Sequence, residues 1–166
     1  MKILIVSDTH GRNENLKRVI EKVKPLDLLI HLGDLGGSEN VIPDLVNEGC
    51  ETEMVQGNND FFARLDREKD IMIGRYRTLL THGDYYNVSL GAETLEEEAG
   101  ARGFDIAMYG HTHRPFYEIY KKEGGRDLLV LNPGSLSCPR QDGHKPSYMV
   151  MELDEKGEAH VTLNFL

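Results

Sequence analysis

After its first methionine the chain runs Lys2-Ile3-Leu4-Ile5-Val6-Ser7-Asp8-Thr9-His10-Gly11, an apolar run that passes directly into polar residues. Such an unbroken apolar run predicts a strand that is buried on both faces. Asp8 and His10 are two residues apart, a spacing at which side chains of an extended chain return to the same side. This stretch therefore predicts a central strand whose end presents a carboxylate and an imidazole to one place.

The same pattern, an apolar run followed by polar residues, occurs four more times. The later clusters are Gly33-Asp34, Gly57-Asn58-Asn59-Asp60, Thr81-His82-Gly83 and Gly110-His111-Thr112-His113. Each cluster alone is weak, because G-N often marks a turn and paired histidines often serve structure. Their order and their place at strand ends carry the argument, since ligand sites of α/β proteins lie beyond the carboxyl ends of strands. Carboxylate, amide and imidazole donors without thiolates suit Mn, Fe or Zn, so the clusters predict a two-metal hydrolytic site.

Bulk composition is that of an ordinary soluble globular protein. The chain has 166 residues, of which 39% are hydrophobic and 28% charged, so we expect one domain over residues 1–166. A net charge of −9 argues against non-specific binding of nucleic acid. We expect no membrane partner, because no run approaches the roughly 20 apolar residues that cross a bilayer. Cys50 and Cys138 lack C-x-x-C spacing, which favours a reducing cytoplasm.

Apolar periodicity and turn residues predict an α/β fold. Helices are expected after the capping residues Asn13 and Ser38 and over residues 89–102. The helix after Ser38 would turn four apolar residues inward: Val41, Ile42, Leu45 and Val46. Strands are expected at residues 2–7, 28–32, 51–56, 71–73, 76–80, 105–109, 117–121, 128–131, 148–153 and 159–163. Gly124-Gly125 indicates a hairpin turn. Parallel units first and hairpins later predict two packed mixed β-sheets flanked by helices.

In these five clusters the chain resembles the calcineurin-like metallophosphoesterases. Its size, the Ser7–Gly11 start and Asn132-Pro133-Gly134-Ser135 resemble the compact YfcE-like phosphodiesterase branch. The resemblance covers residues 2–151 and implies the α-β-β-α sandwich of that family. It also implies two divalent ions, Mn²⁺ first and Zn²⁺, Fe²⁺ or Ni²⁺ as alternatives. One metal would be held by Asp8, His10, Asp34 and His113, and the second by Asp34, Asn58, His82 and His111, with Asp34 bridging.

The implied reaction is hydrolysis of a small phosphodiester. Two dications about 3.5–4 Å apart can clamp a phosphoryl group and generate a hydroxide between them, so no protein nucleophile is assigned. Many relatives carry histidine after the metal-binding asparagine, but this chain has Asn59, which cannot act as a general acid. That difference favours diesters, or esters with good leaving groups, and leaves the general acid unnamed. Asn59 and Arg140 are candidate substrate-binding residues, and Arg12 is a further candidate for phosphate.

Two other functions stay open at this stage. One is a non-catalytic protein-binding scaffold like the retromer subunit of this superfamily, although such scaffolds tend to lose histidines that this chain retains. The other is a phosphomonoesterase. Phe61 and Phe62 follow the third cluster and are candidates for a lid over the site or for a subunit contact in a homo-oligomer. His31 is expected in the core beside the site, and Asp60 in loop stabilisation.

Overall fold

The computed structural model describes residues 1–121 and 126–166, which form two five-stranded sheets packed face to face. The first sheet has the order β10-β9-β1-β2-β3. Its strands are β1 (Lys2–Val6), β2 (Leu28–His31), β3 (Glu51–Met54), β9 (Ser147–Leu153) and β10 (Ala159–Phe165). Strands β1, β2 and β3 are parallel, whereas β9 and β10 form an antiparallel hairpin beside β1. This sheet is mixed, as predicted.

The second sheet has the order β4-β5-β6-β8-β7. Its strands are β4 (Glu68–Ile73), β5 (Tyr76–Thr81), β6 (Ile106–Met108), β7 (Pro115–Tyr120) and β8 (Leu128–Pro133). The three central strands are parallel, and β4 and β7 pair antiparallel with their neighbours at the two edges. The predicted turn at Gly124-Gly125 lies outside the described residues.

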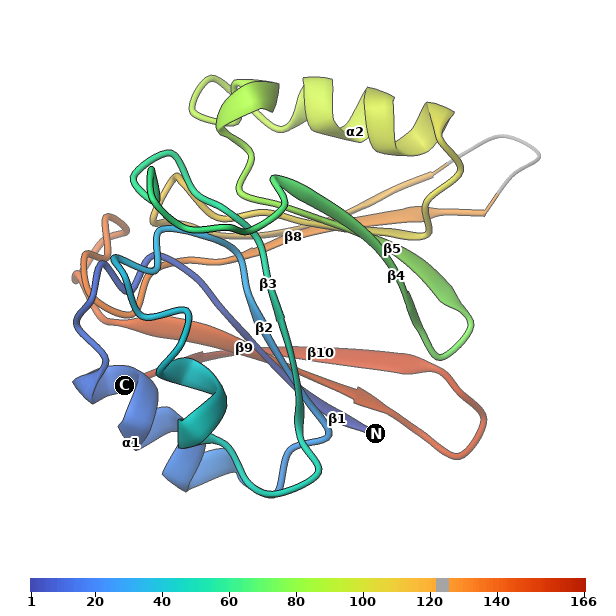
Figure 1. The fold of residues 1–166 in the computed structure, drawn as a ribbon. Helices are drawn as coiled ribbons and strands as arrows, with labels where there is room; N and C mark the ends of the chain where they lie inside the picture. The colour runs from blue at the N-terminus through green and yellow to red at the C-terminus, as the bar shows by residue number, and fades with distance from the viewer. Residues whose placement is uncertain (122–125) are drawn as a thin grey trace.

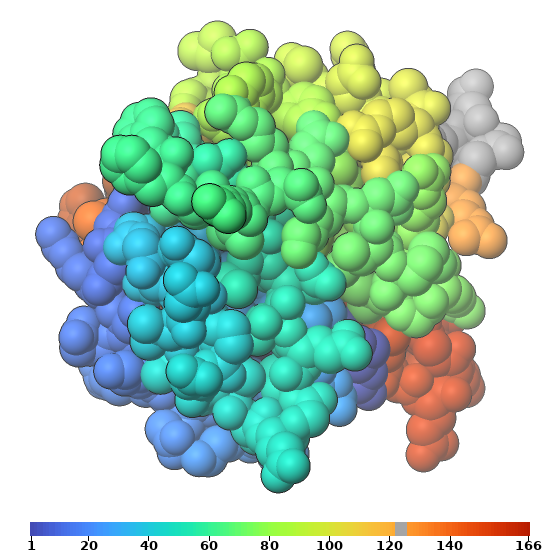
Figure 2. All heavy atoms as spheres, in the orientation of Figure 1, coloured from blue at the N-terminus to red at the C-terminus, as the bar shows by residue number. Residues whose placement is uncertain are grey.

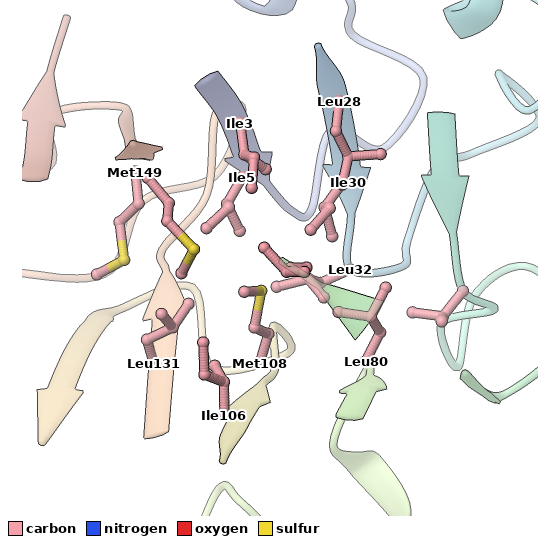
Figure 3. Close-up of a cluster of buried hydrophobic side chains, with 13 residues drawn as sticks. Ile3, Ile5, Leu28, Ile30, Leu32, Leu80, Ile106, Met108, Leu131 and Met149 are labelled. Carbon is pink, nitrogen blue, oxygen red and sulfur yellow. The ribbon is translucent and has the colours of Figure 1, made fainter. Parts of the chain in front are cut away.

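Figure 1 shows the four layers of the fold, with α1 (Glu14–Val23) below the first sheet and α2 (Glu93–Ala101) above the second. Between the sheets lies an apolar core to which both contribute. In Figure 3, Ile3, Ile5 and Ile30 of the first sheet point toward Met108 and Leu131 of the second. Alternate residues of the same strands face α1 instead, which explains why β1 is apolar at every position after Lys2. The α-β-β-α sandwich predicted from the sequence is confirmed.

The helix predicted after Ser38 is wrong. The structure has only a 3₁₀ turn there, η1 (Ile42–Leu45), and Val41 is exposed rather than inward. A helix that began at Ser38 would place Pro43 in its interior, where proline lacks a donor and its ring clashes with the carbonyl four residues earlier. Too few residues then remain before Gly49, whose φ of +83° ends any helix.

The other two helix predictions need smaller corrections. Asn13 does occupy the N-cap position of α1, but its side chain caps nothing and donates instead to Ser38 Oγ at 2.8 Å. Helix α2 begins at Glu93 rather than at Ser89, because Gly91 has a φ of +154° that a helix cannot contain. Leu95 and Ala99 are buried on its inner face as expected. Neither α-helix among the described residues is long and apolar enough to span a bilayer.

Candidate metal centre

The polar clusters lie on loops at one end of the sandwich. Parallel strands point their carboxyl ends to the same edge, and Figure 1 shows the loops after β1, β2, β3, β5 and β6 gathered at the left of the molecule. Asp8 follows β1, Asp34 follows β2, His82 follows β5 and His111 follows β6. Both sheets therefore contribute side chains to one centre, as the strand-end pattern predicted.

The backbone at this centre is left-handed at unusual positions. Among the described residues, seven that are not glycine have positive φ, and five of these belong to the predicted ligand set: Asp8 (55°), His10 (48°), Asp34 (55°), His111 (65°) and His113 (58°). A side chain raises the energy of this conformation, so it persists only where the surroundings enforce it, as they do at functional sites. The tight bends turn these side chains inward.

Four of the predicted ligands meet in a first cluster. Asp8, His10, Asp34 and His113 each offer one atom, and these four atoms lie within 4.8 Å of one another. His113 Nε2 lies 3.1 Å from Asp8 Oδ1 and 3.3 Å from His10 Nε2. His10 Nε2 lies 3.8 Å from Asp34 Oδ2. The set equals the one that the resemblance implied for the first metal.

The remaining predicted ligands form a second cluster on the other side of Asp34. Asn58 Oδ1 lies 3.1 Å from His82 Nε2 and 2.9 Å from His111 Nδ1. The two imidazole nitrogens are 3.3 Å apart, and His82 Nε2 is 3.6 Å from Asp34 Oδ1. The two oxygens of Asp34 thus face one cluster each, which is the geometry a bridging carboxylate needs.

Backbone carbonyls decide which nitrogens of two histidines carry a lone pair. His82 Nδ1 donates to the carbonyl of Leu32 at 2.7 Å, and His113 Nδ1 donates to the carbonyl of Cys138 at 2.7 Å. In the neutral imidazoles Nε2 is then an acceptor that points into the centre. Asp8 Oδ1 is buried there without a hydrogen-bond donor among the described residues. With both imidazoles neutral, acceptors face acceptors at these distances, an arrangement that a bound cation would satisfy, so the residues present fit divalent metal ions.

Electrostatics at Asp8 indicate the same need for positive charge. Burial opposes the charged forms of Asp8 and His113. A protonated His113 would nevertheless supply a donor to Asp8, so the pKa of His113 is raised and that of Asp8 is lowered. Burial also lowers the pKa of His111, and the neighbouring His82 adds to that effect. Neutral His111 is the form that can donate a lone pair to a metal.

A buried carboxylate holds two of the loops together. Asp60 Oδ2 accepts from the backbone N–H of Leu35 at 3.1 Å and of Gly57 at 2.9 Å, and Oδ1 accepts from that of Gly36 at 2.9 Å. These bonds join the loop that carries Asp34 to the loop that carries Asn58. The predicted loop-stabilising role of Asp60 is confirmed.

The end of β8 and the segment after it support the site, and only the family resemblance pointed to them. Asn132 Nδ2 donates to the carbonyl of Gly110 and to Thr112 Oγ1, at 2.6 and 3.1 Å. Ser135 and Ser137 each donate to the carbonyl of Asp8 at 2.8 Å. Figure 2 shows this segment (orange) against the first loop (blue) at the left edge of the molecule. It therefore fixes the backbone beside two of the ligand loops.

The other candidate residues surround the centre. Asn59 donates to both oxygens of Asp34, through its backbone N–H at 2.9 Å and its side chain at 2.6 Å. Arg12, Asn59 and Arg140 line the cavity of about 440 Å³ above the clusters. Phe61 and Phe62 are exposed at 78% and 98%, and neither lines this cavity.

His31 lies beneath the site rather than in it. It is fully buried, and its Nε2 is 3.0 Å from Thr9 Oγ1. Burial lowers its pKa to about 4, so the ring is neutral. The prediction of a core position beside the site is confirmed.

Comparisons with known proteins agree on one family. A model described as the calcineurin-like phosphoesterase superfamily domain matches residues 1–156. A probable metallophosphoesterase from Methanothermobacter thermautotrophicus is 33% identical, over 97% of this chain and 91% of the relative. The phosphodiesterase YfcE of Escherichia coli K12 is 28% identical, over 93% of this chain and 89% of the relative.

Solved structures share the fold. A predicted phosphoesterase from Streptococcus pneumoniae TIGR4 has a TM-score of 0.76 at 24% identity, with 99% of this chain and 97% of that chain covered. Vps29 from Entamoeba histolytica in complex with Zn²⁺ has a TM-score of 0.72 at 23% identity, with 99% of both chains covered. At these identities the likeness establishes the architecture alone.

Proposed function

This chain belongs to the calcineurin-like phosphoesterase superfamily, as the five clusters predicted, and on that premise we propose that it is a phosphodiesterase with two divalent metal ions. The observation that carries the proposal is the convergence of acceptors at the loop end. With His113 neutral, Asp8 Oδ1 has no donor among the described residues, and the lone pairs of His82 and His113 are aimed inward by backbone carbonyls. The relatives named as phosphodiesterases support the same class of reaction.

We propose that the two clusters are the two metal sites. Asp8, His10, Asp34 and His113 would hold one ion, and Asp34, Asn58, His82 and His111 the other. When bound, such ions supply the Lewis acidity that stabilises a phosphoryl group and makes water nucleophilic near neutral pH. Mn²⁺ is the first choice, because this nitrogen and oxygen donor set without thiolate suits it. The free thiols of Cys50 and Cys138 support the cytoplasmic setting that we propose.

The remaining site residues bind and orient the substrate in this proposal. Arg140 and Arg12 line the cavity and can present guanidinium forks to a phosphate. Asn59 uses its side-chain amide on Asp34 and offers no acidic proton. A leaving group would thus depart without help from this position, which favours diesters with good leaving groups over phosphomonoesters.

The test is hydrolysis by metal-stripped protein to which Mn²⁺ is returned. We expect turnover of methyl 4-nitrophenyl phosphate, and we expect His82→Ala and Asp34→Ala to abolish it without loss of the fold as judged by circular dichroism. His144→Ala, at an exposed histidine, is the matched control and should retain activity. Protein that binds two ions but hydrolyses neither diesters nor monoesters would contradict the proposal and favour the scaffold.

Asn59→His separates the two esterase activities. With histidine at this position, we expect the ratio of monoester to diester turnover to rise. An unchanged ratio would show that Asn59 does not decide between the two substrates.

A further inference from the structure

Beside the metal centre lies a second cavity of about 540 Å³, a size typical of small-molecule sites. Its floor is built from Val88, Tyr109 and Phe116, and its rim from Leu90, Arg114 and Arg140. Tyr109 is buried and stands 6.0 Å, centroid to centroid, from Phe116. Leu90 is 91% exposed, although it is a large apolar side chain. We call this cavity the aromatic groove.

The aromatic groove shares a wall with the metal centre. Along the segment 111–114 the side chains alternate, so that His111 and His113 line the metal cavity whereas Thr112 and Arg114 line the groove. Arg140 lines both cavities and therefore stands where they join. A ligand with its phosphate at the metal centre would pass Arg140 to reach the groove.

The charges at this junction suit an anion attached to a flat apolar group. The chain as a whole carries −9, yet Arg114 and Arg140 lie together here, with Arg114 Nε donating to the carbonyl of Arg140 at 3.2 Å. Guanidinium planes stack on aromatic rings as well as binding phosphate. The groove therefore combines cationic, stacking and apolar surfaces in one place.

We propose that the aromatic groove binds a planar aromatic substituent that stays on the phosphate after hydrolysis. This inference rests on the proposed function, and it narrows the substrate to phosphodiesters that carry an aryl or nucleoside group. The product would be the corresponding monoester, held by its phosphate near Arg140 and by its ring over Phe116.

The first test measures binding without catalysis. Phenylphosphonate and methylphosphonate carry the same anionic group on a C–P bond that hydrolysis does not cleave. They differ only in that one has a phenyl ring where the other has a methyl group. Titration calorimetry on Mn²⁺-loaded protein should give about tenfold tighter binding for phenylphosphonate. A nonhydrolysable phosphonate analogue of adenosine monophosphate forms a third arm, and binding tighter than that of phenylphosphonate assigns the groove to nucleosides. Equal affinities for all three ligands would overturn the proposal.

Variants locate the preference in the groove. Leu90→Ser changes an exposed side chain and should reduce the preference for phenylphosphonate severalfold. Leu163→Ser, at a partly exposed leucine on β10 outside the groove, is the matched control and should leave the preference unchanged. Phe116→Ala should remove most of the preference. A preference that survives both groove variants, or that falls equally in the control, would contradict the assignment.

Kinetics then separate this inference from the proposed function. Bis(4-nitrophenyl) phosphate and methyl 4-nitrophenyl phosphate lose the same leaving group and retain an aryl or a methyl substituent. We expect Leu90→Ser to lower kcat/KM for the first and to spare the second. Equal effects on kcat/KM for both diesters would overturn the proposal that the groove binds the retained ring. If neither diester is hydrolysed, the proposed function fails, and the phosphonate titrations still decide whether the groove binds rings.

Discussion

His31 should make the protein lose stability in mild acid, and His31→Gln should remove that loss. The ring is fully buried, and burial lowers its pKa to about 4 from an ordinary value of 6.5. Glutamine is the chosen substitution because its terminal amide can replace Nε2 as the partner of Thr9 Oγ1, which lies 3.0 Å away. The variant thus keeps the contact and removes the titrating group.

The size of the effect follows from proton linkage. Because the folded pKa of His31 lies below the unfolded one, the unfolded chain binds the extra proton between about pH 6.5 and pH 4. The stability that depends on neutral His31 is complete above this window and falls as the pH drops through it. A shift from 6.5 to about 4 corresponds to about 3 kcal/mol in total. About 2 kcal/mol of this should be lost between pH 7 and pH 5.

The assay is urea denaturation of metal-free protein in a chelating buffer at pH 7 and pH 5. Other groups titrate in this range, so the quantity to compare is the difference in unfolding free energy between wild type and variant. We expect this difference to shift by about 2 kcal/mol in favour of His31→Gln at pH 5. His144→Gln, at an exposed histidine, is the control. Parallel stability curves for wild type and His31→Gln would refute the argument that burial keeps this ring neutral.

Two further predictions concern the loops that carry the ligands. Asp60→Ala leaves three backbone N–H groups without their acceptor and should cost about 3 kcal/mol of unfolding free energy, with a smaller cost for Asp60→Asn. Urea denaturation measures both costs. A cost under about 1 kcal/mol for Asp60→Ala would contradict the role of Asp60. Gly57→Ala would place a Cβ 2.2 Å from the backbone nitrogen of Asp34, so it should weaken Mn²⁺ binding at least about tenfold. Gly49→Ala strains the backbone, whose φ is +83°, but its Cβ meets nothing within 4 Å, so it controls for strain without a clash at the centre. Equal Mn²⁺ affinity in both variants by calorimetry would rule out the steric argument.

Much of the fold was predictable because the central strands of the first sheet are apolar on both faces. In β1 and β2 every residue except the terminal Lys2 and His31 is apolar, so the bounds of these strands could be inferred from the sequence. The connection between β2 and β3 could not be predicted, because the apolar spacing after Ser38 resembles that of a helix, which Pro43 prevents. Here one residue outweighed the pattern of its neighbours.

The order and strand-end placement of the clusters predicted that these side chains would meet, and the family resemblance implied their grouping, but the hydrogen bonds that orient the histidines could not be predicted. The acceptors that orient His82 and His113 are the backbone carbonyls of Leu32 and Cys138. Every residue has such a carbonyl, so the sequence carries no sign of which ones will be used. The fold brings these groups together across 50 and 25 residues of chain, respectively.

The left-handed backbone at five of the predicted ligand positions lowers the stability of the fold. Each of these aspartates and histidines adopts a conformation that costs about 1 kcal/mol or more, whereas glycine adopts it freely. In a lineage that had no use for bound cations, drift toward glycine at these positions would yield a more stable protein. Glycine at these positions would therefore relieve backbone strain, at the loss of the side chains that we propose as metal ligands.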